Sequence, residues 1–108
     1  ERVALGGFSD GASYALSLGQ ANGDLFTHVI AFSPGFMTWE ERVGQPEFFI
    51  SHGVHDPILP IDQASRLIVP ALTSAGYSVR YQEFEGSHAV PEDVAMQAFA
   101  WFAGAGEG

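Results

Sequence analysis

Short apolar runs, separated by turn residues such as glycine, proline and asparagine, divide the chain into alternating segments of strand and helix character. Strands are predicted at residues 3–5, 27–32, 47–51 and 78–84. Helices are predicted at residues 12–20, 62–75 and 91–102. Residues 33–46 are expected to form a loop with at most a short turn of helix, and the Gly/Ala tail from Ala103 is expected to fray. Strands that alternate with helices are typical of an α/β fold with a parallel sheet.

The order of these elements also predicts how the helices are distributed over the sheet. Consecutive parallel strands joined by right-handed crossovers place the helices at 12–20 and 62–75 on the same face. The last helix, at 91–102, is free to cover the other face. We therefore expect about four parallel strands with three flanking helices.

The composition fits one globular unit. The chain has 108 residues, of which 46% are hydrophobic, and this predicts a single domain over residues 1–108 without a second one. No apolar stretch approaches the roughly 18 residues of a membrane span, and the N-terminus lacks the pattern of a secretory signal, so a cytoplasmic location is expected. The absence of cysteine excludes disulfides and thiol catalysis.

The charge balance is strongly acidic. Thirteen Asp and Glu residues against four basic ones give a formal net charge of −9 at pH 7. Such a surface opposes binding to nucleic acid or to an anionic membrane. It also disfavours anionic substrates such as phosphates or acyl-CoA, so neutral esters fit better.

A Gly-x-Ser-x-Gly motif, Gly7-Phe8-Ser9-Asp10-Gly11, directly follows the first apolar run. This pattern at the end of a strand is that of a nucleophile elbow, which presents a serine hydroxyl on a sharp turn at a helix N-terminus. Ser9 is therefore a candidate nucleophile. We expect a side chain at Gly7 or at Gly11 to crowd the turn.

An acid and a histidine follow in the order that such serine sites use. Asp56 lies in a loop after the strand at 47–51, and His88 lies in a loop after the strand at 78–84. Both fall at the carboxyl ends of strands, where open parallel sheets place their sites. Asp62 is the rival acid, but it opens a predicted helix and is expected to be its N-cap. A metal site of His52, His55, Asp56 and His88 is the weaker alternative, because the spacing matches no zinc signature.

The stretches GFSDGA, FSPGF, SHGVHDPILP and GSHAVP resemble the C-terminal half of α/β-hydrolases of the phospholipase/carboxylesterase type, which includes acyl-protein thioesterases. This resemblance runs through nearly the whole chain and implies a truncated or minimal α/β-hydrolase fold that lacks the strands before the elbow strand. It implies a nucleophile at Ser9, an acid at Asp56 and a base at His88. No cofactor or metal is implied.

The resemblance further implies that the backbone N–H of Asp10 forms part of an oxyanion hole, whose second donor would come from an earlier loop without a counterpart here. Loss of one such donor lowers the rate by about 10²–10³. A partner chain or another backbone amide near the elbow is a substitute source. Phe36 and Met37 are candidates either for lining an acyl pocket or for ordinary packing.

The expected activity is hydrolysis of small or medium acyl esters or thioesters, through an acyl-enzyme on Ser9. The alternative is a catalytically silent hydrolase-fold fragment that serves as a binding or assembly module. Because the first strand would leave one sheet edge unpaired and some apolar sheet uncovered, a homo-oligomer, most simply a dimer, is also expected.

Overall fold

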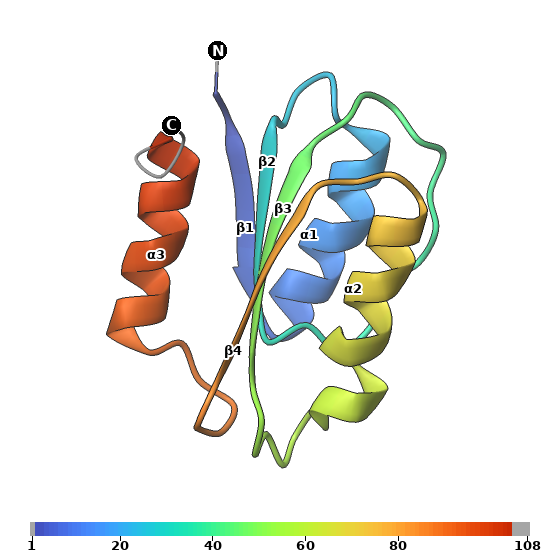
Figure 1. Ribbon diagram of the computed structural model, residues 1–108. Helices are drawn as coiled ribbons and strands as arrows, with labels where there is room; N and C mark the ends of the chain where they lie inside the picture. The colour runs from blue at the N-terminus through green and yellow to red at the C-terminus, as the bar shows by residue number, and fades with distance from the viewer. Residues whose placement is uncertain (1, 105–108) are drawn as a thin grey trace.

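The computed structural model describes residues 2–104, which form a parallel four-stranded sheet between two layers of helices (Figure 1). The elements, in chain order, are β1 (Ala4–Phe8), α1 (Asp10–Ala21), β2 (His28–Phe32), β3 (Glu47–Gly53), the 3₁₀ helix η1 (Ile61–Gln63), α2 (Ser65–Ser74), β4 (Val79–Phe84) and α3 (Glu92–Ala103). The strands follow the order β1-β2-β3-β4. Helices α1 and α2 cover one face, and α3 covers the other. The predicted α/β class, with four parallel strands and three helices, is confirmed.

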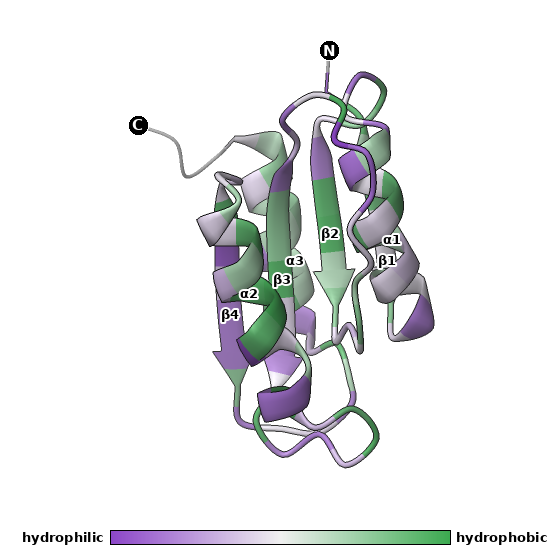
Figure 2. Cartoon of the chain, turned by 90° about the vertical axis from the view of Figure 1, so that its right-hand side faces the viewer, coloured by the Kyte–Doolittle hydropathy of each residue, from purple (hydrophilic) through white to green (hydrophobic). Residues whose placement is uncertain are grey.

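The core lies on both faces of the sheet because the two central strands alternate their side chains between the faces. In β2, Val29 and Ala31 pack toward α1 and α2, whereas Ile30 packs toward α3. In β3, Phe48 packs toward α1 and α2, and Phe49 packs toward α3. Figure 2 shows the result, with hydrophobic residues along β2 and β3 and hydrophilic residues along the edge strand β4.

Several boundaries differ from those predicted. β1 continues to Phe8 because Gly6 and Gly7 pair in register with Ile30 and Ala31 of β2. The helix predicted at 62–75 is divided into η1 and α2, since Ala64, at φ −129° and ψ −105°, leaves the helical region. Within residues 33–46 the structure has no helix. The tail predicted to fray from Ala103 differs at its start, since Ala103 is the last residue of α3. Residues 105–108 of this tail lie outside the described residues.

The parallel register brings all four strand ends to one edge of the sheet, the lower edge in Figure 1. Phe8 pairs with Phe32 there, and Gly53 pairs with Phe84. The loops that follow these strands therefore meet at this carboxyl edge, which is where open α/β sheets form their sites. None of the helices between residues 2 and 104 has the length and hydropathy needed to cross a membrane.

An ion-pair cluster ties α2 to the edge strand β4. Arg66 donates two hydrogen bonds of 2.9 Å to the carboxylate of Glu83 and one of 2.7 Å to Asp62. The hydroxyl of Tyr81 donates a further bond of 2.8 Å to Glu83. The bonds from Arg66, aided by Tyr81, outweigh the partial burial of Glu83 and hold its pKa at about 2, below its ordinary value of 4.5.

The lowered pKa of Glu83 predicts an acid-dependent loss of stability. Below its ordinary pKa, the unfolded chain protonates Glu83 while the folded chain does not, so the free energy of unfolding falls as the pH drops from about 4.5 toward 2. Glu83→Gln removes this contribution, and its unfolding free energy should therefore fall less steeply over that range than that of the unmodified protein. Urea unfolding at several pH values measures both slopes, with Glu41→Gln as an exposed control. Parallel slopes in Glu83→Gln and the unmodified protein would contradict the assignment.

Candidate active site

Ser9 lies between β1 and α1 in a strained backbone conformation. Its φ of 60° and ψ of −119° fall outside the regions that residues with a side chain normally adopt. The turn is held by a hydrogen bond of 2.9 Å from the Ser9 N–H to the carbonyl oxygen of Phe32. Ser13 N–H donates to the Ser9 carbonyl oxygen at 3.1 Å and closes the first turn of α1. These bonds present the half-buried Ser9 side chain at the carboxyl edge of the sheet.

The two glycines of the motif have different roles. A Cβ atom at Gly7 would lie 2.4 Å from the backbone of Gly11, so a side chain at Gly7 is excluded by this close approach. A Cβ atom at Gly11 would meet no atom within 4 Å. The expectation that both positions are crowded is therefore right for Gly7 and wrong for Gly11, because the side-chain direction of Gly11 points into open space.

Asp56 lies in the turn after β3, with a side chain that is fully buried. Its Oδ1 accepts the backbone N–H groups of Ile58 at 2.9 Å and Leu59 at 2.8 Å. Burial opposes ionisation of Asp56, but the hydrogen bonds from Leu59, His88 and Ile58 outweigh it and place its pKa below the ordinary value. The buried group is therefore a carboxylate, which can only accept hydrogen bonds.

His88, in the loop between β4 and α3, joins Asp56 to Ser9. Its Nδ1 lies 2.7 Å from Asp56 Oδ2, and its Nε2 lies 2.9 Å from Ser9 Oγ. Because the carboxylate only accepts, Nδ1 carries the proton, and Nε2 is free to accept the Ser9 O–H. The structure thus brings together the three residues that the sequence singled out, and their geometry permits His88 to take the proton of Ser9.

The loops that carry Asp56 and His88 are fixed to each other by their backbones. Val54 N–H donates to Phe84 O, and His55 N–H donates to Gly86 O, each at 2.9 Å. Their close approach depends on Gly53 at the end of β3. A Cβ atom there would lie 2.3 Å from the Ser87 carbonyl oxygen and 2.4 Å from that of Gly86. Sequence reasoning had given Gly53 no role, because this contact joins segments far apart in the chain.

Gly53→Ala should therefore destabilise the protein, since the backbone of the 86–87 loop has to move away from the added methyl group. Overpacking of this kind lowers the free energy of unfolding by about 1–3 kcal/mol. Urea unfolding measures the change. Gly6→Ala, in β1, is the matched control, because its Cβ would make an ordinary contact of 3.6 Å with Ile30. Equal stability of Gly53→Ala and the unmodified protein would contradict the packing argument.

Asp62, the rival acid, takes no part in this arrangement. It lies within η1 and forms an ion pair of 2.7 Å with Arg66, one helical turn further on. The prediction that Asp62 is a helix N-cap is wrong. The N-cap of η1 is Pro60, and that of α2 is Ala64, because the helix begins earlier and is interrupted.

Asp10, the first residue of α1, follows Ser9 directly. The N–H groups of the first helical turn have no acceptor within their own helix, so the Asp10 N–H is available as a donor beside the Ser9 hydroxyl. The N-terminal end of the helix dipole also favours negative charge at this position. A negative charge that develops next to Ser9 would therefore be stabilised there.

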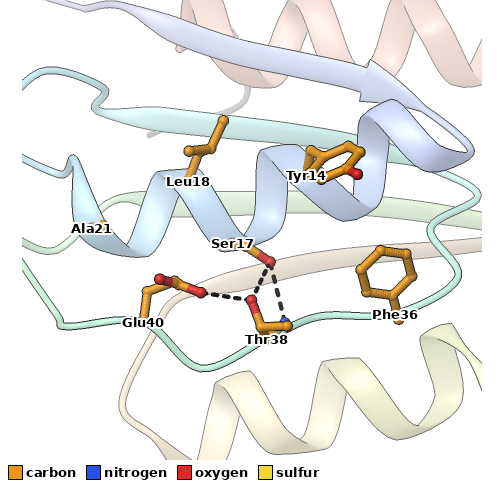
Figure 3. Close-up of a pocket in the computed structure, with 7 residues that line it drawn as sticks. All are labelled: Tyr14, Ser17, Leu18, Ala21, Phe36, Thr38 and Glu40. Atoms are coloured by element: carbon orange, nitrogen blue, oxygen red, sulfur yellow. Dashed lines mark hydrogen bonds between the residues drawn. The ribbon is translucent and has the colours of Figure 1, made fainter.

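Phe36 and Met37, the candidate lining residues, point in different directions. Phe36 is 48% exposed and lines an apolar pocket of about 240 Å³ between α1 and the segment of residues 36–40 (Figure 3). The other lining residues are Tyr14, Ser17, Leu18, Ala21, Thr38 and Glu40. This pocket does not include Ser9, Asp56 or His88. Met37 packs against the core beneath α1 and α2, which favours the packing interpretation for this residue.

His52, in β3, lies behind Asp56 and was considered from sequence only as part of a metal site. Its Nε2 lies 3.3 Å from Asp56 Oδ2, and its ring is fully buried. The exposed His55 points elsewhere and pairs with Glu85 at 3.2 Å. Among residues 2–104, no group of three or more His, Asp or Glu side chains is arranged to hold a metal ion.

Comparison with known proteins places this geometry in context. The family described as phospholipase/carboxylesterase matches residues 1–103. Esterase PE8 is 29% identical in sequence, with a TM-score of 0.80, and the alignment covers 93% of this chain and 48% of that one. The Bacillus cereus carboxylesterase is 21% identical, with a TM-score of 0.80, and the alignment covers 95% of this chain and 50% of that one. Zea mays acyl-protein thioesterase 2 is 16% identical, with a TM-score of 0.78, and the alignment covers 94% of this chain and 55% of that one.

The chain thus spans about half the length of the solved structures that it matches. At 21% and 16% identity, the latter two structures support a shared fold and nothing finer. Comparison with curated proteins gave no match. The resemblance noted from the sequence motifs is confirmed by the family match.

Proposed function

The chain belongs to the phospholipase/carboxylesterase family, and on this premise we propose that it is a serine hydrolase that cleaves carboxylic esters or thioesters of small to medium acyl chain. The observation that carries the proposal is the continuous hydrogen-bonded path from Ser9 through His88 to Asp56, with distances of 2.9 and 2.7 Å. A serine, a histidine and a buried carboxylate in this order form the unit that activates a hydroxyl for acyl transfer.

The first half of the reaction forms an acyl-enzyme. Ser9 Oγ attacks the carbonyl carbon of the ester while His88 Nε2 takes the hydroxyl proton. Asp56 holds the imidazole in the required tautomer and stabilises the imidazolium. When the tetrahedral intermediate collapses, the bond to the leaving group breaks, and His88 gives its proton to the departing alcohol or thiol.

The second half releases the acid. Water attacks the acyl carbon with His88 as base, the bond to Ser9 Oγ breaks, and the same proton returns to Ser9. The Asp10 N–H donates to the carbonyl oxygen as negative charge develops in both halves.

The substrate class is proposed from the charge of the chain. The net charge of −9 disfavours anionic substrates, so an uncharged ester is preferred. The apolar pocket of Phe36 and Tyr14, whose ring centroids are 6.3 Å apart, does not include Ser9, Asp56 or His88, so it does not define the acyl group. No cofactor enters any step.

A fluorophosphonate probe tests the proposed function. An activated serine attacks the probe and becomes covalently phosphonylated, whereas an ordinary serine hydroxyl does not react. We expect labelling at Ser9, identified by mass spectrometry of the peptide, and loss of labelling in His88→Ala. An unlabelled Ser9 in the folded protein would favour the alternative, a catalytically silent hydrolase-fold module that acts in binding or assembly.

We also propose that the chain assembles as a homodimer through the edge of β1. Within residues 2–104 this strand pairs only with β2, and its sequence, Ala-Leu-Gly-Gly-Phe, carries no charge to discourage further pairing. The opposite edge strand, β4, contains Arg80 and Glu83. Light scattering at micromolar concentration should therefore give the mass of a dimer. Ala4→Lys should shift it to monomer, while Ser74→Lys, with the same charge on an exposed end of α2, should not. A monomeric unmodified chain would contradict the proposal.

A further inference from the structure

A second histidine lies close to the carboxylate oxygen that accepts from His88. His52 is the penultimate residue of β3, and its side chain is 0% exposed. A buried imidazole is unfavourable unless its ring nitrogens have hydrogen-bond partners. Here both nitrogens have them, since Nδ1 lies 2.7 Å from Ser65 Oγ and Nε2 lies 2.7 Å from the Leu59 carbonyl oxygen.

These partners determine the tautomer of His52. The Leu59 carbonyl oxygen can only accept, so Nε2 carries the proton and donates it. Nδ1 of the neutral ring then accepts the hydroxyl proton of Ser65, which is itself buried at the start of α2. The ring is thus held from both sides, by a helix and by the turn that contains Asp56.

The turn of residues 56–59 is consequently fixed at two points. Asp56 Oδ1 accepts the N–H groups of Ile58 and Leu59 from within the turn. The Leu59 carbonyl accepts from His52, which ties the end of the turn to β3. The same Nε2–H group lies 3.3 Å from Asp56 Oδ2, the oxygen that accepts from His88.

Two carboxylates lie close to the His52 ring. Asp56 faces His52 from the turn, and Glu83 is its register partner on β4. The Glu83 carboxylate is hydrogen-bonded by Arg66 of α2 and has no hydrogen bond from His52. The hydrogen bonds of His52 therefore act on the position of the Asp56 carboxylate.

We propose that His52, held by Ser65, is a positioning residue that keeps Asp56 Oδ2 aligned on His88. This role rests on the proposed function, because alignment matters to catalysis only if Asp56 and His88 are the acid and the base. His52 touches neither the substrate nor Ser9. Its effect passes through the turn of residues 56–59.

Kinetics of three variants test the role. His52→Phe keeps a planar aromatic ring, somewhat larger than imidazole, but removes both hydrogen bonds, and a displacement of about 1 Å in a reacting group lowers the rate by about 10²-fold. We expect kcat to fall by that factor, with KM unchanged. His52→Gln should recover much of the loss, because its amide nitrogen can replace Nε2 as donor to Leu59. The kcat of Ser65→Ala should lie between those of His52→Phe and His52→Gln.

His28→Phe is the matched control. His28 is likewise a buried strand histidine, with Nδ1 2.7 Å from Thr27 Oγ1 and its ring against Trp101, at the opposite end of the sheet. The two substitutions make the same chemical change, but His28→Phe should leave kcat unaltered. An unaltered kcat in a folded His52→Phe variant would overturn the proposal. If His52→Phe does not fold, an unaltered kcat in Ser65→Ala would overturn the proposal instead.

A measurement without substrate separates this proposal from the proposed function. The Nδ1 proton of His88, donated to a buried carboxylate, should give a separate low-field proton NMR resonance. We expect it to be lost or shifted in His52→Phe and kept in His28→Phe. That result supports positioning even if the unmodified chain hydrolyses no ester, an outcome that refutes only the proposed function. An unchanged resonance in both variants would overturn the positioning role.

Discussion

Ser9→Ala is expected to lower the hydrolysis of short p-nitrophenyl esters to the background rate. Removing the nucleophile of a complete serine triad lowers kcat by about 10⁶. We therefore expect the rate of Ser9→Ala to fall to that of the reaction without protein, a loss of up to about 10⁶. Initial rates measured by absorbance provide the comparison.

His88→Ala should be as inactive as Ser9→Ala, and the double variant no worse than either, because the two residues act as a unit. Ser74→Ala, an exposed serine at the end of α2, controls for the loss of a hydroxyl and should retain full activity. Equal ester hydrolysis by Ser9→Ala and the unmodified protein would show that another group is the nucleophile.

Asp56→Asn is expected to cause the second large loss, by about 10⁴ in a complete triad. The Ile58 and Leu59 N–H groups require an acceptor, so the oxygen of the new amide remains directed at them. Its NH₂ group then faces His88 Nδ1 and donates to it. The imidazole proton moves to Nε2, which can no longer accept the proton of Ser9.

Asp62→Asn is the matched control for this substitution. Asp62 carries the same functional group six residues further along the chain. It is exposed, and an ion pair between exposed side chains such as that with Arg66 contributes little to stability. Activity close to that of the unmodified protein is therefore expected. A loss in Asp62→Asn that matches the loss in Asp56→Asn would contradict the assignment of the acid.

The fold could be predicted from the sequence because its signals are local. The apolar runs at 27–32 and 47–51 correspond to β2 and β3, which are buried on both faces and so need no polar alternation. The order of strands and helices, with right-handed crossovers, was sufficient to divide the helices between the two faces. The candidate site followed from the same logic, because Ser9, Asp56 and His88 each come after a strand, and parallel strands end at one edge.

The boundaries of the elements were less predictable because they depend on pairing. β3 continues through His52 and Gly53 only because β4 offers Glu83 and Phe84 as partners. The helix predicted from 62 breaks at Ala64, for which the residue type supplies no signal. As a result, the N-cap assigned to Asp62 was wrong, although its exclusion from the arrangement of Asp56 and His88 agrees with the structure.

What the sequence determined by itself was therefore the α/β class, the order of its elements and the residue types that reach the carboxyl edge. The tertiary structure alone decided which groups touch there. It showed that Gly53 admits the 86–87 loop, that Gly11 faces open space and that His52 supports the turn of Asp56. The physical reason is distance along the chain. Local patterns report propensity and periodicity, whereas contacts such as His52 with Ser65 depend on where separate elements pack.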